Sequence, residues 1–299
     1  MTTLAAVVDA ELARSVPAAA GAAAREIALA QGGEAVLFYG SVLRTGDLDG
    51  VLDFYVLTGD GGPASRWLWP DVSYHEIDVR GRIVRAKVAT MPAARFRAAA
   101  EGRHLDTTIW ARFVQPCALA WSADAAAAAR ARDAVVAAIG TAARFAAALG
   151  PGRGPARTYW KALFAATYAT EFRVEKPGRE DQILGFAADR FDRLLPLAWA
   201  ADGIAFDEMG GELTPHLTPG ERRRLLGAWA ARRRAGKPLN LARLVKAAFT
   251  FAGASRYALW KIERHTGLNI PLTPWRERHP ILAAPGVLWR VWRTAGARR

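Results

Sequence analysis

The chain has 299 residues, which is enough for one large domain or two ordinary ones with a complete hydrophobic core. Its 41 lysines and arginines against 28 acids give a formal net charge of +13, which favours a polyanionic partner; an ordinary solvated surface in an arginine-rich protein is the alternative. A single cysteine excludes an intramolecular disulfide, and because no run of about 18 apolar residues occurs, no membrane span is expected.

The first predicted element is a helix over residues 3–31, which breaks at Pro17 and ends at Gly32 and Gly33. Charged residues at positions 9, 11 and 14 interrupt the apolar run that a signal peptide requires. A cytoplasmic protein is therefore expected.

Two apolar runs, residues 35–39 and 51–57, flank a polar segment that begins with Gly40 and Ser41, which predicts a strand, an exposed loop and a second strand. Glycine lets backbone N–H groups approach a triphosphate closely, and Asp53 in the second strand can present its carboxylate to Mg²⁺. This order is typical of the nucleotidyltransferase superfamily. The alternative is a simple Gly-Ser turn before an ordinary strand with a capping aspartate.

The second acid of that signature is missing. Residues 53 and 55 share a strand face, and a two-metal site normally needs a carboxylate at both, but Tyr55 carries a phenol. Asp78, in the later run HEIDV, is the first candidate to complete the site. Asp47 and Asp49 form another possible pair in the turn, and a degenerate pocket is the third possibility.

Residues 73–79 and 82–88 predict a β-hairpin around an Arg-Gly turn. Glu76 and Asp78 fall on one face of its first strand, and Arg85 and Lys87 on one face of its second. A pocket could therefore take carboxylates from one strand and cations from the other. His75 is a candidate acid or phosphate ligand, although a structural histidine is the commoner case.

The rest of the chain predicts mainly helices. They cover residues 91–101, 107–120 (as a helix, or a helix and a strand), 123–149, 158–175, 183–200 and 241–266. The segment PGRGPAR, residues 151–157, is the best linker candidate, so domains are expected over 1–150 and 151–299. Two arginine triplets in residues 220–238 predict either a basic amphipathic helix for an anionic surface or a solvated helix face.

The C-terminal tail has its own pattern. Trp289 and Trp292 alternate with Arg290 and Arg293, and no acid follows Glu277. Tryptophan rings suit the bilayer interface and guanidinium groups suit lipid phosphates, so this pattern favours an anionic membrane surface over nucleic acid.

Four of these segments resemble the mitochondrial-type phosphatidate cytidylyltransferases, the peripheral CDP-diacylglycerol synthases. Residues 39–56 are similar to their Tyr-Gly-Ser segment followed by a strand with Asp-Phe, a pattern that also lacks an acid two residues later. Residues 83–121 match a strand with a basic residue, a short helix, a spacer and an ending of the Gly-Arg-x-x-Lys-Pro-Val kind, here ARFVQPCAL with Gln115 in place of lysine. TYATEFRVE, residues 167–175, is similar to Ser-Tyr-x-Gly-Asp-Phe-Arg, and the helix ending in RYALWKIERHTGLNI occupies the place of their C-terminal helical region.

The resemblance implies an α+β fold, with a nucleotidyltransferase-like mixed β-sheet domain followed by a mainly helical, winged-helix-like domain. It also implies Mg²⁺-dependent transfer of CMP from CTP to phosphatidate, giving CDP-diacylglycerol and pyrophosphate on the inner face of the cell membrane. Asp53 and Asp78 would bind the metal, with Glu171 as another acid. The remaining expected site residues, which hold or stabilise phosphate groups, are Gly40, Ser41, Lys87 and Arg173. A nucleotidyltransferase with a soluble or RNA acceptor and a non-catalytic nucleotide-binding protein are the alternatives.

Overall fold

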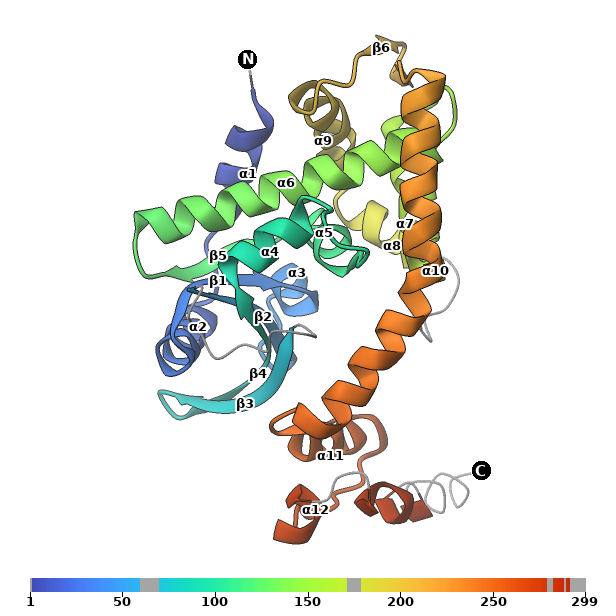
Figure 1. Ribbon diagram of the computed structural model, residues 1–299. Helices are drawn as coiled ribbons and strands as arrows, with labels where there is room; N and C mark the ends of the chain where they lie inside the picture. Colours follow the sequence, from blue (N-terminus) through green and yellow to red (C-terminus); the bar gives the residue numbers. More distant parts are fainter. Residues whose placement is uncertain (1, 60–69, 171–178, 279–281, 288, 291–299) are drawn as a thin grey trace.

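The computed structural model describes residues 2–59, 70–170, 179–278, 282–287 and 289–290 (Figure 1). Its strands are β1 (Gly33–Tyr39), β2 (Val51–Thr58), β3 (Asp71–Val79), β4 (Arg82–Pro92), β5 (Ala118–Ser122), β6 (Phe206–Met209) and β7 (Glu212–Pro215). The helices of the first half are α1 (Leu4–Leu12), α2 (Ala18–Gln31), α3 (Ser41–Thr45), α4 (Ala93–Ala100), α5 (Thr108–Phe113) and α6 (Ala125–Leu149). Those of the second half are α7 (Ala156–Thr170), α8 (Arg179–Phe186), α9 (Ala188–Ala201), α10 (Pro219–Thr250), α11 (Ala254–Thr266) and α12 (Pro274–Arg278).

The centre of the first half is a five-stranded mixed sheet with the order β3-β4-β2-β1-β5. The strands β2 and β4 run parallel, and the other neighbouring pairs run antiparallel. The predicted α+β class, the two strands around the Gly-Ser segment and the later β-hairpin are therefore confirmed. In the hairpin, Glu76 pairs with Arg85, which places acids and cations of the two strands on one face, as the alternation predicts.

Both faces of the sheet are covered by helices. On one face, α2 packs its alanines and Ile27 against Val36, Phe38 and Phe54. On the other, side chains such as Leu37 and Leu57 pack against α4, α5 and α6. A sheet that is buried on both faces explains why its strands read as nearly continuous apolar runs.

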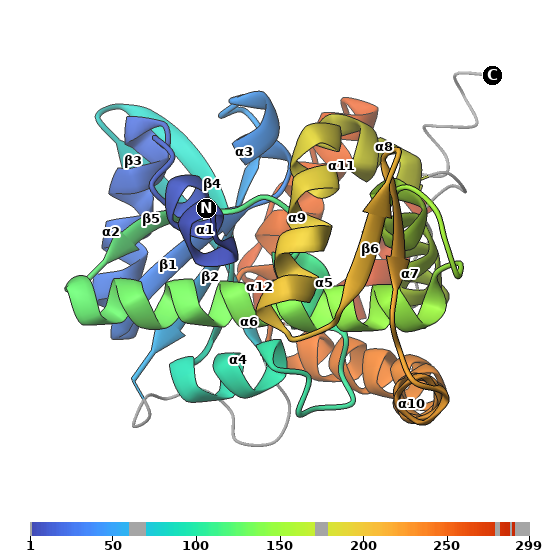
Figure 2. The ribbon, with the colours of Figure 1, turned by 90° about the horizontal axis from the view of Figure 1, so that it is seen from above.

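The long helix α6 joins the two halves of the molecule. Asp124 caps it by accepting a hydrogen bond from the N–H of Ala127 at 2.6 Å. Its alanines allow close approach, and it crosses from the sheet to α7, α9 and α10 (Figures 1 and 2). One hydrophobic core contains buried residues from both sides of segment 151–157, including Phe145 and Trp160. The domain boundary expected in that segment stays a prediction.

Several predicted helices differ in extent from those observed. The helix expected over 3–31 is divided into α1 and α2, as Pro17 predicted, whereas the single helix expected over 183–200 is two helices, α8 and α9. Residues 107–120 form a helix and a strand, α5 and β5. Helix α10 continues through Pro238, and a left-handed Gly253 (φ +79°) separates it from α11.

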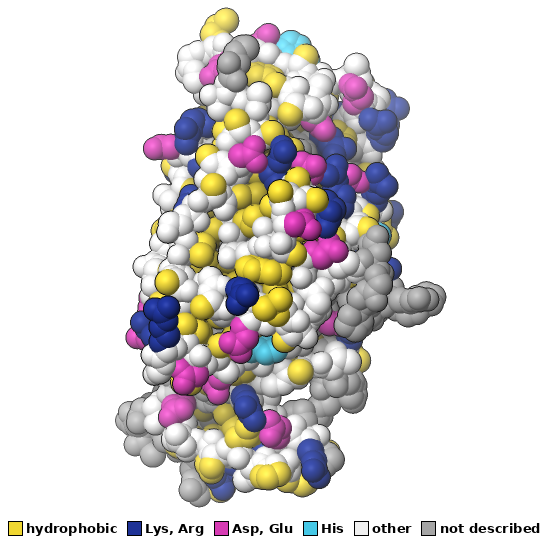
Figure 3. Space-filling model, turned by 90° about the vertical axis from the view of Figure 1, so that its left-hand side faces the viewer, with side chains coloured by type: hydrophobic (Ala, Val, Ile, Leu, Met, Phe, Trp, Pro, Cys, Tyr) yellow, Lys and Arg dark blue, Asp and Glu magenta, His cyan; other side chains and the backbone are white. Residues whose placement is uncertain are grey.

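On the face shown in Figure 3, acidic and basic side chains are intermingled around a band of hydrophobic side chains. Among the described helices, none is long and apolar enough to cross a membrane.

Candidate functional site

A row of polar side chains crosses four neighbouring strands of the sheet, at the level where β1 ends. The strand register pairs Tyr39 of β1 with Asp53 of β2, Asp53 with Lys87 of β4, and Lys87 with Tyr74 of β3. Directly paired residues project from the same face, so the phenol of Tyr39, the carboxylate of Asp53 and the ammonium of Lys87 are neighbours. The sheet topology thus places an acid between a hydroxyl and a cation.

The turn after β1 is built around Gly40. Its backbone has φ +91° and ψ −162°, a conformation that is essentially restricted to glycine. A Cβ at this position would also collide with Oδ2 of Asp53. Two constraints therefore require glycine at position 40. One is the backbone conformation, and the other is the space that the carboxylate of Asp53 occupies. The helix α3 that begins at Ser41 has only five residues, so its dipole contributes little.

Arg112 of α5 approaches the acid from the other side. Its Nη1 donates a hydrogen bond to the hydroxyl of Tyr39 at 3.1 Å, and its guanidinium carbon lies 5.0 Å from the centre of the same ring. Burial raises the pKa of Asp53, and the charges of Lys87, Arg112 and Arg44 oppose that rise. Burial also lowers the pKa of Lys87, while Asp53 opposes that decrease. One carboxylate therefore lies among three cations in a site that is poorly solvated.

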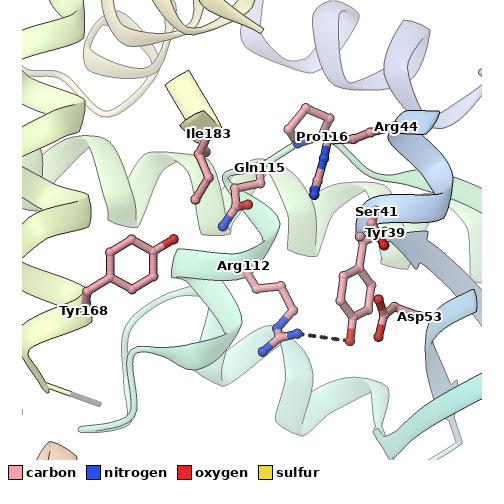
Figure 4. Close-up of a pocket in the computed structure, with 10 residues that line it drawn as sticks. Tyr39, Ser41, Arg44, Asp53, Arg112, Gln115, Pro116, Tyr168 and Ile183 are labelled. Atoms are coloured by element: carbon pink, nitrogen blue, oxygen red, sulfur yellow. Dashed lines mark hydrogen bonds between the residues drawn. The ribbon is translucent and has the colours of Figure 1, made fainter. Parts of the chain in front are cut away.

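A cavity of about 260 Å³ opens beside this carboxylate. Figure 4 shows side chains from both halves of the chain around it, with Arg112 and Tyr39 next to Asp53 and with Tyr168 of α7 on the opposite side. Its lining residues are Tyr39, Gly40, Ser41, Arg44, Asp53, Arg112, Gln115, Pro116, Tyr168 and Ile183. The lining is mostly polar and cationic, which suits a phosphorylated ligand.

Helix α11 borders the same row beyond β3. The ring of Tyr257 lies 5.4 Å from that of Tyr74, and the ammonium of Lys261 lies 5.8 Å from the centre of the Tyr257 ring. Burial raises the pKa of Tyr257, and the negative charge of Asp53 raises it further. The C-terminal half therefore contributes groups close enough to Asp53 to sense its charge.

The structure brings some of the expected site residues together and separates others. Gly40, Ser41 and Asp53 line the cavity, and Lys87 is the strand neighbour of Asp53. Asp78 lies four residues beyond Tyr74 along β3, about 13 Å at strand spacing, where its Oδ1 accepts a hydrogen bond from the N–H of Gly81 at 2.6 Å. The structure therefore places Asp78 at the hairpin turn and away from Asp53.

Other residues that the sequence singled out have different surroundings. Asp49 forms an exposed ion pair with Arg82 at 2.9 Å. His75 lies 2.8 Å from the hydroxyl of Ser73, and burial lowers its pKa. Glu171 and Arg173 lie outside the described residues.

Tyr55 shares the face of Asp53 but lies under α4 and α5. Its ring packs against Tyr39, Phe96 and Phe113, and burial raises its pKa. Within the described part of the chain, its hydroxyl has no hydrogen-bond partner. A carboxylate at position 55 would be buried among aromatic rings, which explains why this chain has no acid there.

The fit of a divalent cation can be judged from the donors present. Among the described residues, no group of three or more histidine, cysteine, aspartate or glutamate side chains could hold a metal ion. Asp53 and the hydroxyl of Ser41 border one cavity, however. Mg²⁺ commonly binds through one or two carboxylates together with substrate phosphates and water. The donors therefore fit a cation that arrives with a polyphosphate, and not a preformed cage.

Arg44, Arg112 and Gln115 were not among the expected site residues, although all three line the cavity. The signal for two of them was present: Arg112 and Gln115 fall in ARFVQP, where the family pattern carries arginine and lysine, and they are three residues apart. Arg44 carries no such signal, because a charged residue in a short loop is common.

The site can therefore neutralise several phosphate charges around one carboxylate and hold them against a glycine turn.

No protein-family model matches the chain, and no curated protein matches it.

Proposed function

We propose that the chain is a Mg²⁺-dependent nucleotidyltransferase that transfers CMP from CTP to phosphatidate, giving CDP-diacylglycerol and pyrophosphate. The observation that carries this proposal is the position of Asp53, beside the Gly40 turn and among Lys87, Arg112 and Arg44, on the wall of a polar cavity. A Gly-Ser pair after one strand and an acid on its antiparallel neighbour are what a nucleotidyltransferase-type sheet requires. The helical second half would then be of the winged-helix-like kind that the sequence resemblance implies.

In this reaction, an oxygen of the phosphatidate phosphate forms a bond to the α-phosphorus of CTP. The bond from that phosphorus to the bridging oxygen of the β-phosphate breaks, and pyrophosphate leaves with the electron pair. Enzymes of this class act mainly by positioning the groups and neutralising charge. A bound Mg²⁺, held by Asp53 and Ser41, would supply charge neutralisation on the phosphates.

The chain's own cations perform the remaining work. The guanidinium groups of Arg112 and Arg44 can bind phosphate oxygens with two parallel hydrogen bonds. Lys87 contributes a point charge beside Asp53 and opposes the rise that burial causes in the pKa of that carboxyl group. The contribution expected from Arg173 and the second acid expected at Glu171 belong to the same proposal, on residues outside the described part of the chain.

A lipid acceptor requires contact with a bilayer, and α10 offers a suitable face. Leu241, Leu244 and Val245 are each more than half exposed. They lie on the side of α10 opposite Arg243 and Lys246, which are bound to Asp106 and Asp71 of the main body. The whole helix carries seven arginines and two lysines against one acid, Glu221. A basic helix with exposed leucines supports peripheral binding to an anionic membrane, on the cytoplasmic side.

The test is incubation of the purified protein with radiolabelled CTP, Mg²⁺ and phosphatidate in mixed micelles, followed by organic extraction. Label should enter the lipid phase with the wild-type protein. Asp53→Asn should lower the rate by about 100-fold or more, because the charge beside the phosphates is lost. Circular dichroism should show that this variant is folded.

Asp78→Asn is the matched control, because it makes the same chemical change and keeps an acceptor oxygen for the N–H of Gly81. It should retain near-normal turnover. Near-normal turnover of Asp53→Asn would refute the role of that carboxylate. Nucleotide binding without lipid labelling would instead point to a soluble or RNA acceptor, or to a non-catalytic nucleotide-binding protein.

A further inference from the structure

A second cavity adjoins the cavity beside Asp53. Its volume is about 340 Å³, and it shares Arg44, Gln115, Pro116 and Ile183 with the first cavity. Figure 4 shows Gln115 and Ile183 across the cavity from Asp53, whereas Arg44 lies on the same side as Ser41 and Asp53. Two residues of α8, Gln182 and Phe186, extend the lining beyond them. The two cavities are therefore adjacent and share part of their lining.

The chemical character changes along this path. Asp53 and Arg112 line only the first cavity, whereas the aromatic ring of Phe186 lines only the second. Phe186 is 55% exposed, so its ring is accessible to a ligand. A ligand that fills both cavities would have a charged end and a flat or apolar end.

Arg44 lies at the junction. Its guanidinium carbon is 5.6 Å from the centre of the Phe186 ring, and its charge also acts on Asp53. A guanidinium over a ring presents its edge hydrogens sideways, which leaves donors for phosphate oxygens. This arrangement suits a ligand whose phosphate is close to a planar group.

We propose that the second cavity is the nucleobase subsite, in which the base stacks on Phe186 and the amides of Gln115 and Gln182 face its polar edge. This inference rests on the proposed function and adds the residues that recognise the nucleoside. An acyl chain is the competing occupant. It would cover the side-chain oxygen of Gln115 without offering it a hydrogen bond, at a cost of about 1–3 kcal/mol. A base edge offers both donors and acceptors.

The amides also provide a means of selection. Each primary amide both donates and accepts, so it can pair with the adjacent carbonyl and amino groups of a base. Gln115 is held by a hydrogen bond of 3.2 Å from its Nε2 to the carbonyl oxygen of Ala111, which fixes its orientation. Gln182 lines the outer side of the pocket, where its amide would face the edge of the base. Its substitution should therefore change the relative affinities for different bases.

The experiment is calorimetric titration of the full chain with CTP, UTP, ATP and inorganic tripolyphosphate in the presence of Mg²⁺. The tripolyphosphate probes the first cavity alone. Phe186→Leu keeps an apolar side chain but removes the ring, so it should weaken CTP binding about tenfold, as expected for one stacked base. Tripolyphosphate binding should stay unchanged, and Phe186→Tyr should restore CTP binding. Gln182→Ala should alter the ratio of CTP to UTP and ATP affinity.

Met209→Ala, at an exposed apolar residue of β6, is the control and should bind every probe as the wild type does. Equal CTP affinity in the wild type and Phe186→Leu would overturn the base subsite, even in a protein that transfers CMP. A changed KM for phosphatidate with unchanged CTP affinity would assign the pocket to the acyl chain. Conversely, Phe186→Leu could weaken CTP binding in a protein that labels no lipid. That result would support the base subsite and refute the proposed acceptor.

Discussion

Two glycines near the site show how a single residue can serve a backbone need and a chemical need. Gly40 and Gly46 flank α3, and both have positive φ values, +91° and +73°. A Cβ on Gly46 would meet nothing within 4 Å, whereas a Cβ on Gly40 would collide with Asp53. A substitution of Gly46 therefore tests backbone strain alone, whereas a substitution of Gly40 tests backbone strain together with displacement of the Asp53 carboxylate.

Gly40→Ala should lower both stability and turnover. The unfavourable backbone region costs about 1–3 kcal/mol, and the new methyl group displaces the Asp53 carboxylate, so activity should fall by at least about tenfold. Gly46→Ala should cost about 1–2 kcal/mol of stability with little change in turnover of the folded protein. Urea denaturation and the lipid-labelling assay measure the two effects. Equal activity losses in the two variants would contradict a separate contact between Gly40 and Asp53.

Residues near the glycine turn could be predicted from sequence because their relation is local. Gly40 and Ser41 directly follow β1, and Asp53 lies on the next strand, so the antiparallel pairing of β1 with β2 places them near each other. The hairpin turn fixes the register of β3 against β4, but the distance of Asp78 from Asp53 depends on the parallel register of β4 against β2, which the sequence does not specify. Arg112 lies in a segment that the sequence singled out, but its position beside Asp53 depends on how α5 folds over the sheet.

At the scale of elements, the sheet was largely predictable and the boundaries of the helices were not. Apolar runs separated by glycine-containing turns indicated β1 to β4. The β6-β7 hairpin was missed, although Gly210 and Gly211 form its turn with positive φ values, because its four-residue strands are polar and partly exposed. Pro238 did not end α10, since neighbouring packing maintains the helix beyond it.

The attachment of α10 to the first half of the chain depends on a buried ion pair. Arg243 donates from Nη1 to Oδ1 of Asp106 at 3.0 Å, and its Nη2 lies 2.5 Å from Oδ2. Burial alone would raise the pKa of Asp106, but Arg243 and the hydrogen bonds from Thr108 lower it overall. The folded-state pKa thus lies below the unfolded value of about 3.9. The pair's stabilisation is complete above that pH and is lost as pH falls through the folded-state pKa.

Arg243→Met should lower the free energy of unfolding at pH 7 by about 3 kcal/mol, because it leaves the buried carboxylate of Asp106 without its counter-charge. The difference from the wild type should shrink as the pH falls below about 4, through the folded-state pKa of Asp106, since a protonated Asp106 no longer needs a cation. Urea denaturation at a series of pH values checks both statements. Arg256→Met is the control: its pair with Glu277 is exposed, so the change should be within about 0.5 kcal/mol. A pH-independent difference for Arg243→Met would contradict this account.

At the scale of the whole molecule, the net positive charge of the chain raises the question of which surface binds an anionic partner. Acidic and basic side chains are intermingled on the face shown in Figure 3. Helix α10, by contrast, exposes six basic residues against one acid, Glu221, and its exposed leucines face away from the body that holds Arg243 and Lys246. A surface that combines excess charge with exposed apolar groups binds anionic bilayers through both interactions.

The full-length protein should float with vesicles that contain phosphatidylglycerol and should not float with vesicles of phosphatidylcholine alone, and added salt should weaken binding. Leu244→Asp should lower the partition coefficient for vesicle binding about tenfold. The reason is that a leucine that enters the bilayer is replaced by a negative charge, which anionic lipids repel. Leu29→Asp, at a residue of α2 that is 61% exposed, makes the same chemical change elsewhere and should leave flotation unchanged. Equal losses for both variants would attribute binding to net charge alone. Retention on RNA at a salt concentration that abolishes flotation would assign the basic surface to nucleic acid.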